Sequence, residues 1–319
     1  MAADTGLTDA GLADHRLADH RLAELAVVGI MAIWAGNFIV VKAAIAVLPP
    51  IGYTLLRFAL GGVVLLAFTR IREGSVGMPL RDLAPIAALG ALGFGVYQML
   101  WTTALQHTTA GTSSLIIAST PIFTMLIAAA IGSDTLSRWK AIGAAVSFCG
   151  VAVVIAAGTG LAVDTRLVGE LMTLLAALLW ATYIALGAPF LRRHSPLRTT
   201  AWAIAAGTVV LTPFGAWQLA GTNLSAVGFG AVLAVIYSGL IAAAISNVVV
   251  FRGVQLLGPT RIANLQFLIP AMAVLLAAIV LGEPIQLVQV LGGATIVAGI
   301  FIARRDAAPV PEAELVEPA

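Results

Sequence analysis

Tryptophan and small polar side chains recur at matched spacings inside long apolar runs of the chain. Trp34 and Asn37 are three residues apart, and Trp180 and Tyr183 repeat that spacing in the second half. Residues three apart share one face of a helix. A membrane protein carries its aromatic belts at the two interfaces, so a tryptophan in the middle of an apolar run favours a binding cavity. Packing between helices is the alternative for these residues.

Other polar and aromatic residues fall inside further apolar runs. Amides within a membrane are costly unless they are paired or hydrated, which favours Asn37, Asn247 and Gln266 as cavity residues. Serines also hold helices together, and Trp101 lies near enough to the end of its run to serve at an interface. Asn264, Ser113 and Ser114 are further candidates. We predict that substrate is bound by residues from this set: Trp34, Asn37, Tyr97, Gln98, Trp101, Ser119, Trp180, Tyr183, Ser246, Asn247 and Gln266.

The apolar runs lack the residues that catalysis needs. The chain holds one cysteine and four histidines, and none of them forms a spaced nucleophile, acid or metal-ligand constellation. The chain also has no G-x-x-x-x-G-K-[ST] loop for nucleotide phosphates. We therefore expect no enzymatic activity, no cofactor and no metal. An intramembrane enzyme or a channel is the alternative of another class.

Carboxylates occur only near the ends of the apolar runs. Asp134, Glu170 and Glu283 all occupy such positions. Carboxylate relays are the usual machinery of proton coupling in membranes. Their absence from the middle of the runs predicts facilitated movement of substrate down its own gradient. Proton-coupled export of other metabolites or drugs is the alternative.

Four further residues could be misread as functional groups. We expect Lys42 and Arg57 to extend their charges towards the membrane surface or, for Arg57, to pair with a helix end. For Arg57, binding of a substrate carboxylate is the alternative. We interpret His107 as a polar cap in a link between helices, and Cys149 as a small buried hydrophobe.

Composition places these residues in a membrane. Hydrophobic residues make up 60% of the 319 residues and charged ones 10%, whereas soluble domains carry about 25% charged residues. Runs of about 20 apolar residues predict spanning helices. The sequence predicts an all-α integral membrane protein with ten such helices: 22–46, 52–71, 83–106, 109–132, 138–158, 168–191, 197–220, 228–251, 258–281 and 285–303.

The basic residues predict the orientation of these helices. Of the 17 Lys and Arg residues, all but Lys42, Arg57 and Arg166 lie in the termini or in links that would face one side. Basic residues concentrate in short cytoplasmic loops. An even number of spans then predicts that both termini are cytoplasmic.

The two halves of the chain repeat each other. At an offset of 149 residues, STPIFTMLIAAAIGSD from Ser119 corresponds to LIPAMAVLLAAIVLGE from Leu268, and Tyr97-Gln98 corresponds to Ser246-Asn247. Each half would hold five spans, so the copies must be inverted in the membrane, which is typical of transporters. Pro121 and Pro270 occupy matched positions and each removes a backbone hydrogen bond, so we predict hinges there, with a static kink as the alternative.

Several of these motifs resemble a known family. They are WAGNFIVVK near Trp34, YTLLRF around Arg57, ALQHTTAGTSSLIIASTPIFT before the first matched proline, and VQLLGPTRIANLQFLIPAMAVLLAAIVLGEPI in the second half. Over about residues 24–305 the chain resembles the drug/metabolite transporter superfamily, in its ten-helix EamA branch. The resemblance implies export of amino acids, aromatic ones among them, and related small metabolites from a bacterial inner membrane through a central cavity.

The domain organisation follows from the repeat. We predict a cytoplasmic tail over 1–23, a first five-helix repeat over 24–158, a second over 159–305 and a disordered tail over 306–319. The expected partners are a small-molecule substrate and membrane lipids. We expect no nucleic-acid partner, because the basic residues are not clustered into a nucleic-acid patch. We also expect a monomer.

Overall fold

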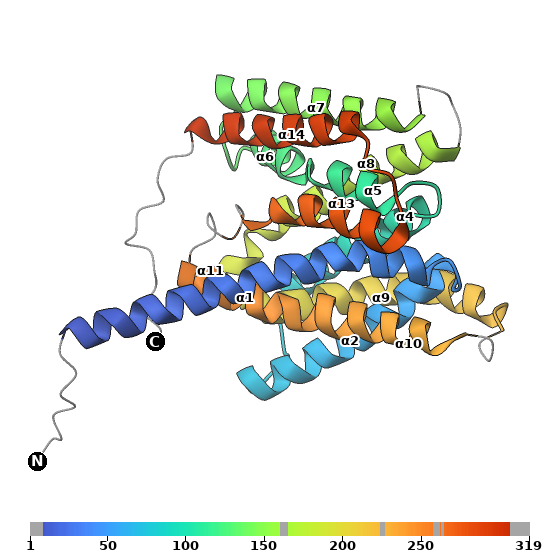
Figure 1. Ribbon diagram of the computed structural model, residues 1–319. Helices are drawn as coiled ribbons and strands as arrows, with labels where there is room; N and C mark the ends of the chain where they lie inside the picture. Colours follow the sequence, from blue (N-terminus) through green and yellow to red (C-terminus); the bar gives the residue numbers. More distant parts are fainter. Residues whose placement is uncertain (1–8, 160–164, 224–226, 258–261, 263–264, 307–319) are drawn as a thin grey trace, which may run out of the picture.

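The protein folds into a bundle of helices. The computed structural model describes residues 9–159, 165–223, 227–257, 262 and 265–306, and it contains no strand within them. The helices lie roughly parallel to one another along the length of the bundle (Figure 1). This architecture agrees with the all-helical class that the apolar runs predict.

The first half of the chain forms five helical stretches, two of them built from more than one segment. Their bounds are α1 (Asp9–Ala44), α2 (Pro50–Glu73), α3 (Leu80–Gly90) with η1 (Ala91–Val96) and α4 (Tyr97–Ala104), α5 (Ala110–Ile117) with α6 (Thr120–Ala130), and α7 (Arg138–Thr159). α1 begins within the segment predicted as a tail, so that segment continues the first helix. α2 begins at Pro50, whose missing N–H is not needed at a helix start, and ends at Gly74 with φ 70°.

The second half repeats the order of these segments. Its bounds are α8 (Thr165–Gly187), the short η2 (Phe190–Arg192), α9 (Pro196–Ala220), α10 (Phe229–Ile236) with η4 (Tyr237–Ile245) and α11 (Ser246–Leu257), α13 (Leu268–Leu281), α14 (Leu287–Ala303) and the short η5 (Arg304–Asp306). α13 ends at Gly282, whose φ of 67° suits a residue without a Cβ.

Eight helical stretches of the described residues are long and apolar enough to cross a membrane. Two further apolar helices, Leu268–Leu281 and Leu287–Ala303, are shorter. They coincide with parts of the ninth and tenth predicted spans, and the start of the ninth lies outside the described residues. The described part of the chain therefore has eight candidate spanning helices, and the count of ten stays a prediction.

Departures from regular helix occur at matched places in the two halves. η1 and η4 are π-helical, and they end at Val96 and Ile245, which are 149 residues apart. A π segment leaves backbone groups less tightly paired and is frequent at functional sites. The predicted prolines also coincide with interruptions: α5 stops at Ile117 and α6 starts again just before Pro121, while α13 starts just before Pro270.

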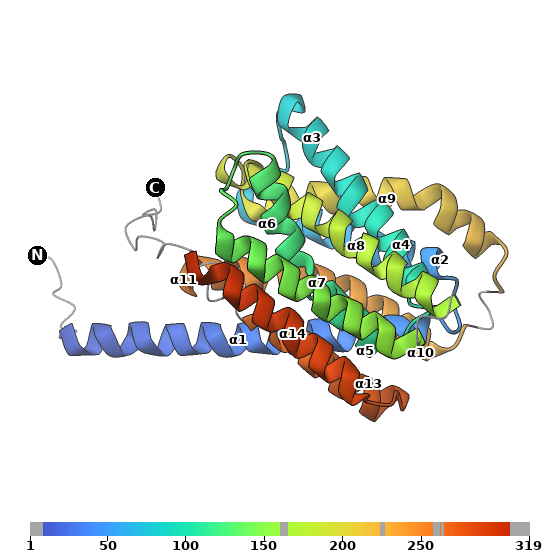
Figure 2. The same ribbon diagram turned by 90° about the horizontal axis from the view of Figure 1, so that it is seen from above.

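The fifth helices of the two halves, α7 and α14, lie side by side (Figures 1 and 2). A Cβ on Gly143 would lie 2.4 Å from the Gly299 carbonyl oxygen, and one on Gly150 would lie 2.7 Å from that of Gly292. Glycine is therefore required for these helices to approach so closely. Gly143 precedes Gly150 in α7, whereas its contact Gly299 follows Gly292 in α14. The two helices are therefore antiparallel.

In these contacts, each glycine of α7 touches the repeat partner of the other glycine. Gly143 is matched with Gly292 in the sequence but touches Gly299, and Gly150 touches the partner of Gly143. Ser147 Oγ donates a hydrogen bond of 2.9 Å to the carbonyl oxygen of Ile296, its own repeat partner. Reciprocal contacts of this kind are expected between two copies related by a two-fold axis.

Other contacts between helices form similar pairs. α1 packs on α13 and α8 on α6; α2 packs on η4 and α9 on η1; α4 packs on α8 and α11 on α1. In each pair the second contact is the repeat counterpart of the first. The halves are thus interleaved, and a site between them is built from both.

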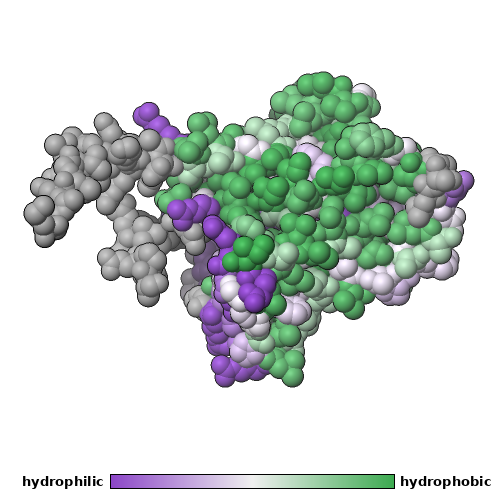
Figure 3. Space-filling view, turned by 90° about the horizontal axis from the view of Figure 1, so that it is seen from below, coloured by the Kyte–Doolittle hydropathy of each residue, from purple (hydrophilic) through white to green (hydrophobic). Residues whose placement is uncertain are grey.

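The surface has the character of a membrane protein. Hydrophobic residues cover most of the face in Figure 3, and hydrophilic ones gather mainly towards the end from which α1 projects. The start of α1 and the end of α14 lie at this same end of the bundle (Figure 1).

Candidate functional site

Four stacked aromatic rings run through the bundle between the two halves. Trp101 stacks on Tyr97 at 6.4 Å between ring centroids, Tyr97 on Trp180 at 5.3 Å, and Trp180 on Tyr183 at 5.0 Å. We call Trp101, Tyr97, Trp180 and Tyr183 the aromatic ladder. Two of its rings come from α4 and two from α8, so the stack of Tyr97 on Trp180 joins the halves. Phe94 of η1 meets Trp180 and Tyr183 edge-on at 5.4 and 5.3 Å.

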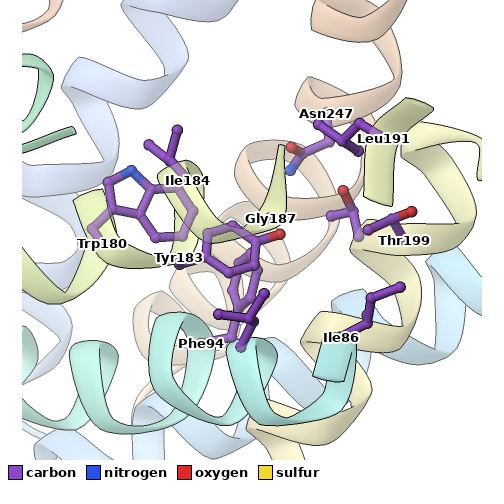
Figure 4. Close-up of a pocket in the computed structure, with 11 residues that line it drawn as sticks. Ile86, Phe94, Trp180, Tyr183, Ile184, Gly187, Leu191, Thr199 and Asn247 are labelled. Carbon is purple, nitrogen blue, oxygen red and sulfur yellow. The ribbon is translucent and has the colours of Figure 1, made fainter. Parts of the chain in front are cut away.

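One end of the aromatic ladder forms the wall of a cavity of about 160 Å³. Figure 4 shows Trp180, Tyr183 and Phe94 on one side of it and Asn247 on the other. Its lining residues come from α3, η1, α8, η2, α9 and α11: Ile86, Leu89, Phe94, Trp180, Tyr183, Ile184, Gly187, Leu191, Thr199, Thr200 and Asn247. An apolar cavity of roughly 150 Å³ can hold a molecule the size of benzene, so this one has room for a ring-sized group.

Arg57 lies at the other end of the aromatic ladder. Its side chain is 3% exposed, and its guanidinium centre lies 4.7 Å from the ring of Phe58 and 5.6 Å from those of Tyr53 and Trp101. Nη2 donates a hydrogen bond of 2.5 Å to Oε1 of Gln98. We call these five residues the Arg57 cluster.

The prediction that Arg57 extends towards the membrane surface is wrong. α2 crosses η4 so closely that a Cβ on Gly239 would lie 2.4 Å from the Arg57 carbonyl oxygen. The side chain itself is buried among Tyr53, Phe58, Gln98 and Trp101, so it does not extend to the surface. The sequence could have suggested its neighbour Tyr53, which is one helical turn away at i−4.

A hydrogen-bonded set beside the Arg57 cluster joins three helices. Tyr53 Oη and Ser238 Oγ lie 2.6 Å apart, and Ser238 Oγ donates to Asn37 Oδ1 at 2.7 Å. Trp34 Nε1 donates to the Ala242 carbonyl oxygen at 2.9 Å. Trp34 and Asn37 thus contact the π segment η4 and do not line the cavity.

The structure brings together most of the residues predicted as a binding set. Trp180, Tyr183 and Asn247 line the cavity, and Tyr97, Gln98 and Trp101 lie behind them along the aromatic ladder. The amide of Asn247 donates to the Ala243 carbonyl oxygen at 2.5 Å and leaves its own carbonyl oxygen for other partners. Phe94, Thr199 and Thr200 were missed; the spacing of Phe94, three residues before Tyr97, is the signal that could have found the first.

The predicted serines and Gln266 lie elsewhere. Ser119 and Ser246 are fully buried and donate to carbonyl oxygens of their own helical stretches, Ile116 at 2.7 Å and Ile241 at 2.8 Å. Gln266 is exposed and is not among the residues that line the cavity. Asn264 lies outside the described residues.

Two of the remaining serines have structural bonds. Ser113 Oγ accepts a hydrogen bond of 3.1 Å from Trp101 Nε1, which holds the aromatic ladder against α5. Ser114 Oγ donates to the Gly111 carbonyl oxygen at 2.7 Å within α5. These bonds agree with the alternative that serines hold helices together.

Charged residues close the end of the bundle that lies opposite the cavity. The carboxylate of Glu283 accepts hydrogen bonds from the backbone N–H groups of Ala110 at 2.8 Å and Gly111 at 3.0 Å, the first turn of α5. A carboxylate is stabilised there by the helix dipole. Lys42 Nζ donates to the carbonyl oxygens of Leu105 and, at 2.7 Å, Thr108. Lys42 therefore binds the end of α4 and does not extend towards headgroups as predicted.

The repeat counterpart of Glu283 makes a different contact. Asp134 pairs with Lys140 at 2.6 Å and is 41% exposed. The hydrogen bond from Lys140 is the main reason that the pKa of Asp134 lies below its usual range. The two ends of the bundle thus differ: the end with Glu283 is tied down across the halves, whereas Asp134 stays within its own half.

Two smaller predictions have different outcomes. Cys149 is exposed and not buried as predicted. It lies on a face of α7 away from α14, and a helix in lipid is apolar on both faces, so hydropathy alone could not place it. His107 is exposed in the link between α4 and α5, as the interpretation of a polar cap requires.

The described residues contain no group of three or more His, Cys, Asp and Glu side chains that could hold a metal ion. The cavity is lined by aromatic, aliphatic, hydroxyl and amide groups. Such a lining can bind a small molecule with an apolar body.

Relatives of known sequence share this organisation. The chain is 30% identical over 275 residues to a probable terminal-alkyne amino-acid exporter of Streptantibioticus cattleyicolor, covering 85% of this chain and 90% of the relative. It is 26% identical over 285 residues to a probable amino-acid metabolite efflux pump of Salmonella typhimurium, covering 86% and 91%. An uncharacterised transporter of Archaeoglobus fulgidus is 27% identical over 276 residues, covering 85% and 93%.

The fold also has a counterpart among solved structures. A crystal structure of a protein 20% identical in sequence superposes with a TM-score of 0.62 and covers 89% of this chain and 96% of its own. The model of the EamA-like transporter family matches the chain twice, over residues 21–156 and 167–305. The chain therefore belongs to the EamA-like transporter family of the drug/metabolite transporter superfamily, and it is a multi-pass membrane transporter built from two repeats.

Proposed function

We propose that this protein exports amino acids, aromatic ones among them, and related small metabolites across a bacterial inner membrane by alternating access. The observation that carries the proposal is the cavity at the end of the aromatic ladder, formed between the two repeats. Transporters of inverted repeats bind substrate at this kind of interface. The printed names of two relatives, an amino-acid exporter and an amino-acid metabolite efflux pump, support the same class of substrate.

The arrangement of the two ends supports an inward-facing state. With both termini in the cytoplasm, the cavity lies in the cytoplasmic half, beside the ends of α3, α8 and α9 that bear the basic links. Lys42 and Glu283 then close the outer end. Substrate would enter from the cytoplasm, and an exchange of the contacts made by the halves would open the outer end.

We propose that transport is facilitative, because the cavity lining contains no carboxylate. Proton-coupled export is the alternative, and a specific residue favours it. Glu170 of α8 is fully buried, and Arg166 Nε donates to its Oε1 at 3.2 Å. A buried carboxylate in a membrane protein can carry protons.

Counterflow in proteoliposomes tests the substrate class. Net uptake into unloaded liposomes tests the coupling, because proton-coupled carriers also exchange substrate without a pH gradient. Liposomes loaded with unlabelled phenylalanine should accumulate labelled phenylalanine without any pH gradient, and leucine should compete less well because it cannot stack. If net uptake requires an imposed pH gradient, and Glu170→Gln removes that requirement, the proton-coupled alternative holds. Failure of every amino acid in the panel to exchange would refute the proposed substrate class.

A further inference from the structure

Arg57 carries a buried charge with few partners. The residue is 3% exposed, and within the described part of the chain its guanidinium bonds one side chain, the neutral amide of Gln98. The buried Nε atom has no hydrogen-bond partner among the described residues. Leaving a cation in this state is costly, because a charge taken out of water requires pairing and hydrogen bonds. The rings of Phe58, Tyr53 and Trp101 supply cation–π attraction but no negative charge.

No carboxylate of the described chain forms an ion pair with Arg57. Four of the five carboxylates that are buried or half-buried in the described chain have identified partners elsewhere: Glu73 with Arg198, Asp82 with His194, Glu170 with Arg166 and Glu283 with the start of α5. The fifth, Glu24, also has an interaction. The anion that would balance Arg57 must therefore come from outside the described chain. The free Nε and the Nη2 atom lie on one edge of the guanidinium, and that edge matches the two oxygens of a carboxylate.

We propose that Arg57 binds the carboxylate of the transported substrate and that the aromatic ladder binds its apolar body. This inference rests on the proposed function and narrows its substrate class. The carboxylate would take Nε and displace the Gln98 oxygen from Nη2, which leaves the Gln98 amide free to donate to the bound anion. Trp101, at 5.6 Å from the guanidinium centre, would flank the part of the substrate next to the carboxylate.

The route to Arg57 runs along the aromatic ladder. Trp180 lines the cavity and stacks on Tyr97, and Tyr97 stacks on Trp101, which covers Arg57. Tyr97 and Trp180 belong to different halves, so movement of one half against the other would separate this pair. Arg57 is therefore reached only when the stack between the halves opens, as alternating access requires.

The same geometry makes the amino group of the substrate dispensable. Neither the cavity lining nor the Arg57 cluster contains a carboxylate that could bind an ammonium group. The site should therefore select small carboxylates with an aromatic or apolar body, whether or not they carry an amine. Amino acids would be one subset of this class.

Four related compounds test this selectivity on the purified full-length protein: L-phenylalanine, 3-phenylpropionate, L-phenylalaninamide and phenethylamine. Thermal stabilisation in detergent measures binding, and uptake of labelled phenylalanine and 3-phenylpropionate into proteoliposomes measures transport. Both carboxylates should bind, and the amide and the amine should bind at least about 30-fold more weakly, because they leave Arg57 unpaired. Binding of the amide as tight as that of phenylalanine would overturn the inference.

Substitutions assign the selectivity to one residue. Arg57→Gln should reduce the preference for carboxylate over amide to less than about threefold, and Arg57→Lys should keep part of it because a point charge lacks the bidentate edge. Arg198→Gln removes the same charge from a residue paired with Glu73 and should leave the preference unchanged. If Arg57→Gln does not fold, the comparison of the four compounds on the unaltered protein still tests whether the site requires a carboxylate.

The outcomes separate this inference from the proposed function. Transport of 3-phenylpropionate without transport of phenylalanine would support the role of Arg57 and refute amino-acid export. Transport of phenylalanine that is inhibited equally by its amide would refute the role of Arg57 and leave amino-acid export standing. Binding of neither carboxylate would refute both.

Discussion

At the scale of single residues, the site depends on rings that stack across the two halves. Trp180 contacts Tyr97 on one face and Tyr183 on the other, and it also forms part of the cavity wall. Stacked aromatic pairs contribute about 0.5–1.5 kcal/mol beyond the burial of their area. We therefore expect Trp180 to contribute to a preference for aromatic over aliphatic substrates when a substrate ring enters this stack.

Replacing Trp180 tests this role. Trp180→Ala should raise the KM for phenylalanine about tenfold, since about 1.4 kcal/mol of stacking is lost, and should change the KM for leucine much less. Trp180→Phe should restore most of the difference. Trp217→Ala is the matched control, because Trp217 is 79% exposed on α9. Equal changes for phenylalanine and leucine would show that Trp180 serves packing alone.

At the scale of helices, an interaction between a side chain and a helix start joins the two halves at the end of the bundle opposite the cavity, which is the outer end in the proposed orientation. Glu283 follows α13 of the second half, and it accepts hydrogen bonds from the first N–H groups of α5 in the first half. Capping of this kind typically contributes about 1 kcal/mol, so the contact is strong enough to bias a conformation and weak enough to release.

Glu283→Ala should open the outer end. In a Cys149→Ala background with Ser114→Cys as reporter, labelling by a membrane-impermeant thiol reagent should rise about fivefold, which corresponds to about 1 kcal/mol in the closing equilibrium. Ser114 is 2% exposed near the start of α5 and reports on this end. Asp134→Ala should leave the labelling unchanged, because Asp134 pairs within its own half. No rise in Glu283→Ala would mean that other contacts keep the end closed.

At the scale of the whole molecule, the two repeats are antiparallel and exchange contacts. The reciprocal approach of Gly143 to Gly299 and of Gly150 to Gly292 is what a two-fold axis between the antiparallel helices α7 and α14 produces. The start of α1 and the end of α14 lie at one end of the bundle (Figure 1). This placement agrees with the predicted even number of crossings, and from the basic links we expect that end to face the cytoplasm.

Reporter fusions at the two ends test this orientation. If both ends face the cytoplasm, as predicted, a fluorescent protein fused at either terminus should be fluorescent in intact bacterial cells. Alkaline phosphatase fused at either terminus should be inactive. A phosphatase placed in the link near Gln106, between α4 and α5, should be active and serves as the positive control. Opposite results for the two termini would exclude an even number of spans.

Much of the architecture could be predicted from the sequence because both halves of the chain carry the same pattern of apolar runs, prolines and polar residues. The matched prolines coincide with helix interruptions, and the pairing of Tyr97-Gln98 with Ser246-Asn247 places each pair directly after a π segment. The residues Trp180, Tyr183 and Asn247 of the candidate site were also found, because they interrupt apolar runs. Exposure was harder to predict, as Cys149 and Gln266 demonstrate. A spanning helix is apolar on the face towards lipid as well as on the face towards protein. Its hydropathy pattern therefore does not show which residues face the interior of the protein.

By itself, the sequence determined that the chain is helical, lies in a membrane and consists of two related halves, because length, hydropathy and repetition are properties of the chain alone. Only the tertiary structure decided which polar groups meet. Arg57 looked like a residue near a helix end, and its packing against Gln98 and Trp101 made it a buried cation. Contacts between residues this far apart in the chain depend on how whole helices pack, and the local sequence around each residue does not determine that packing.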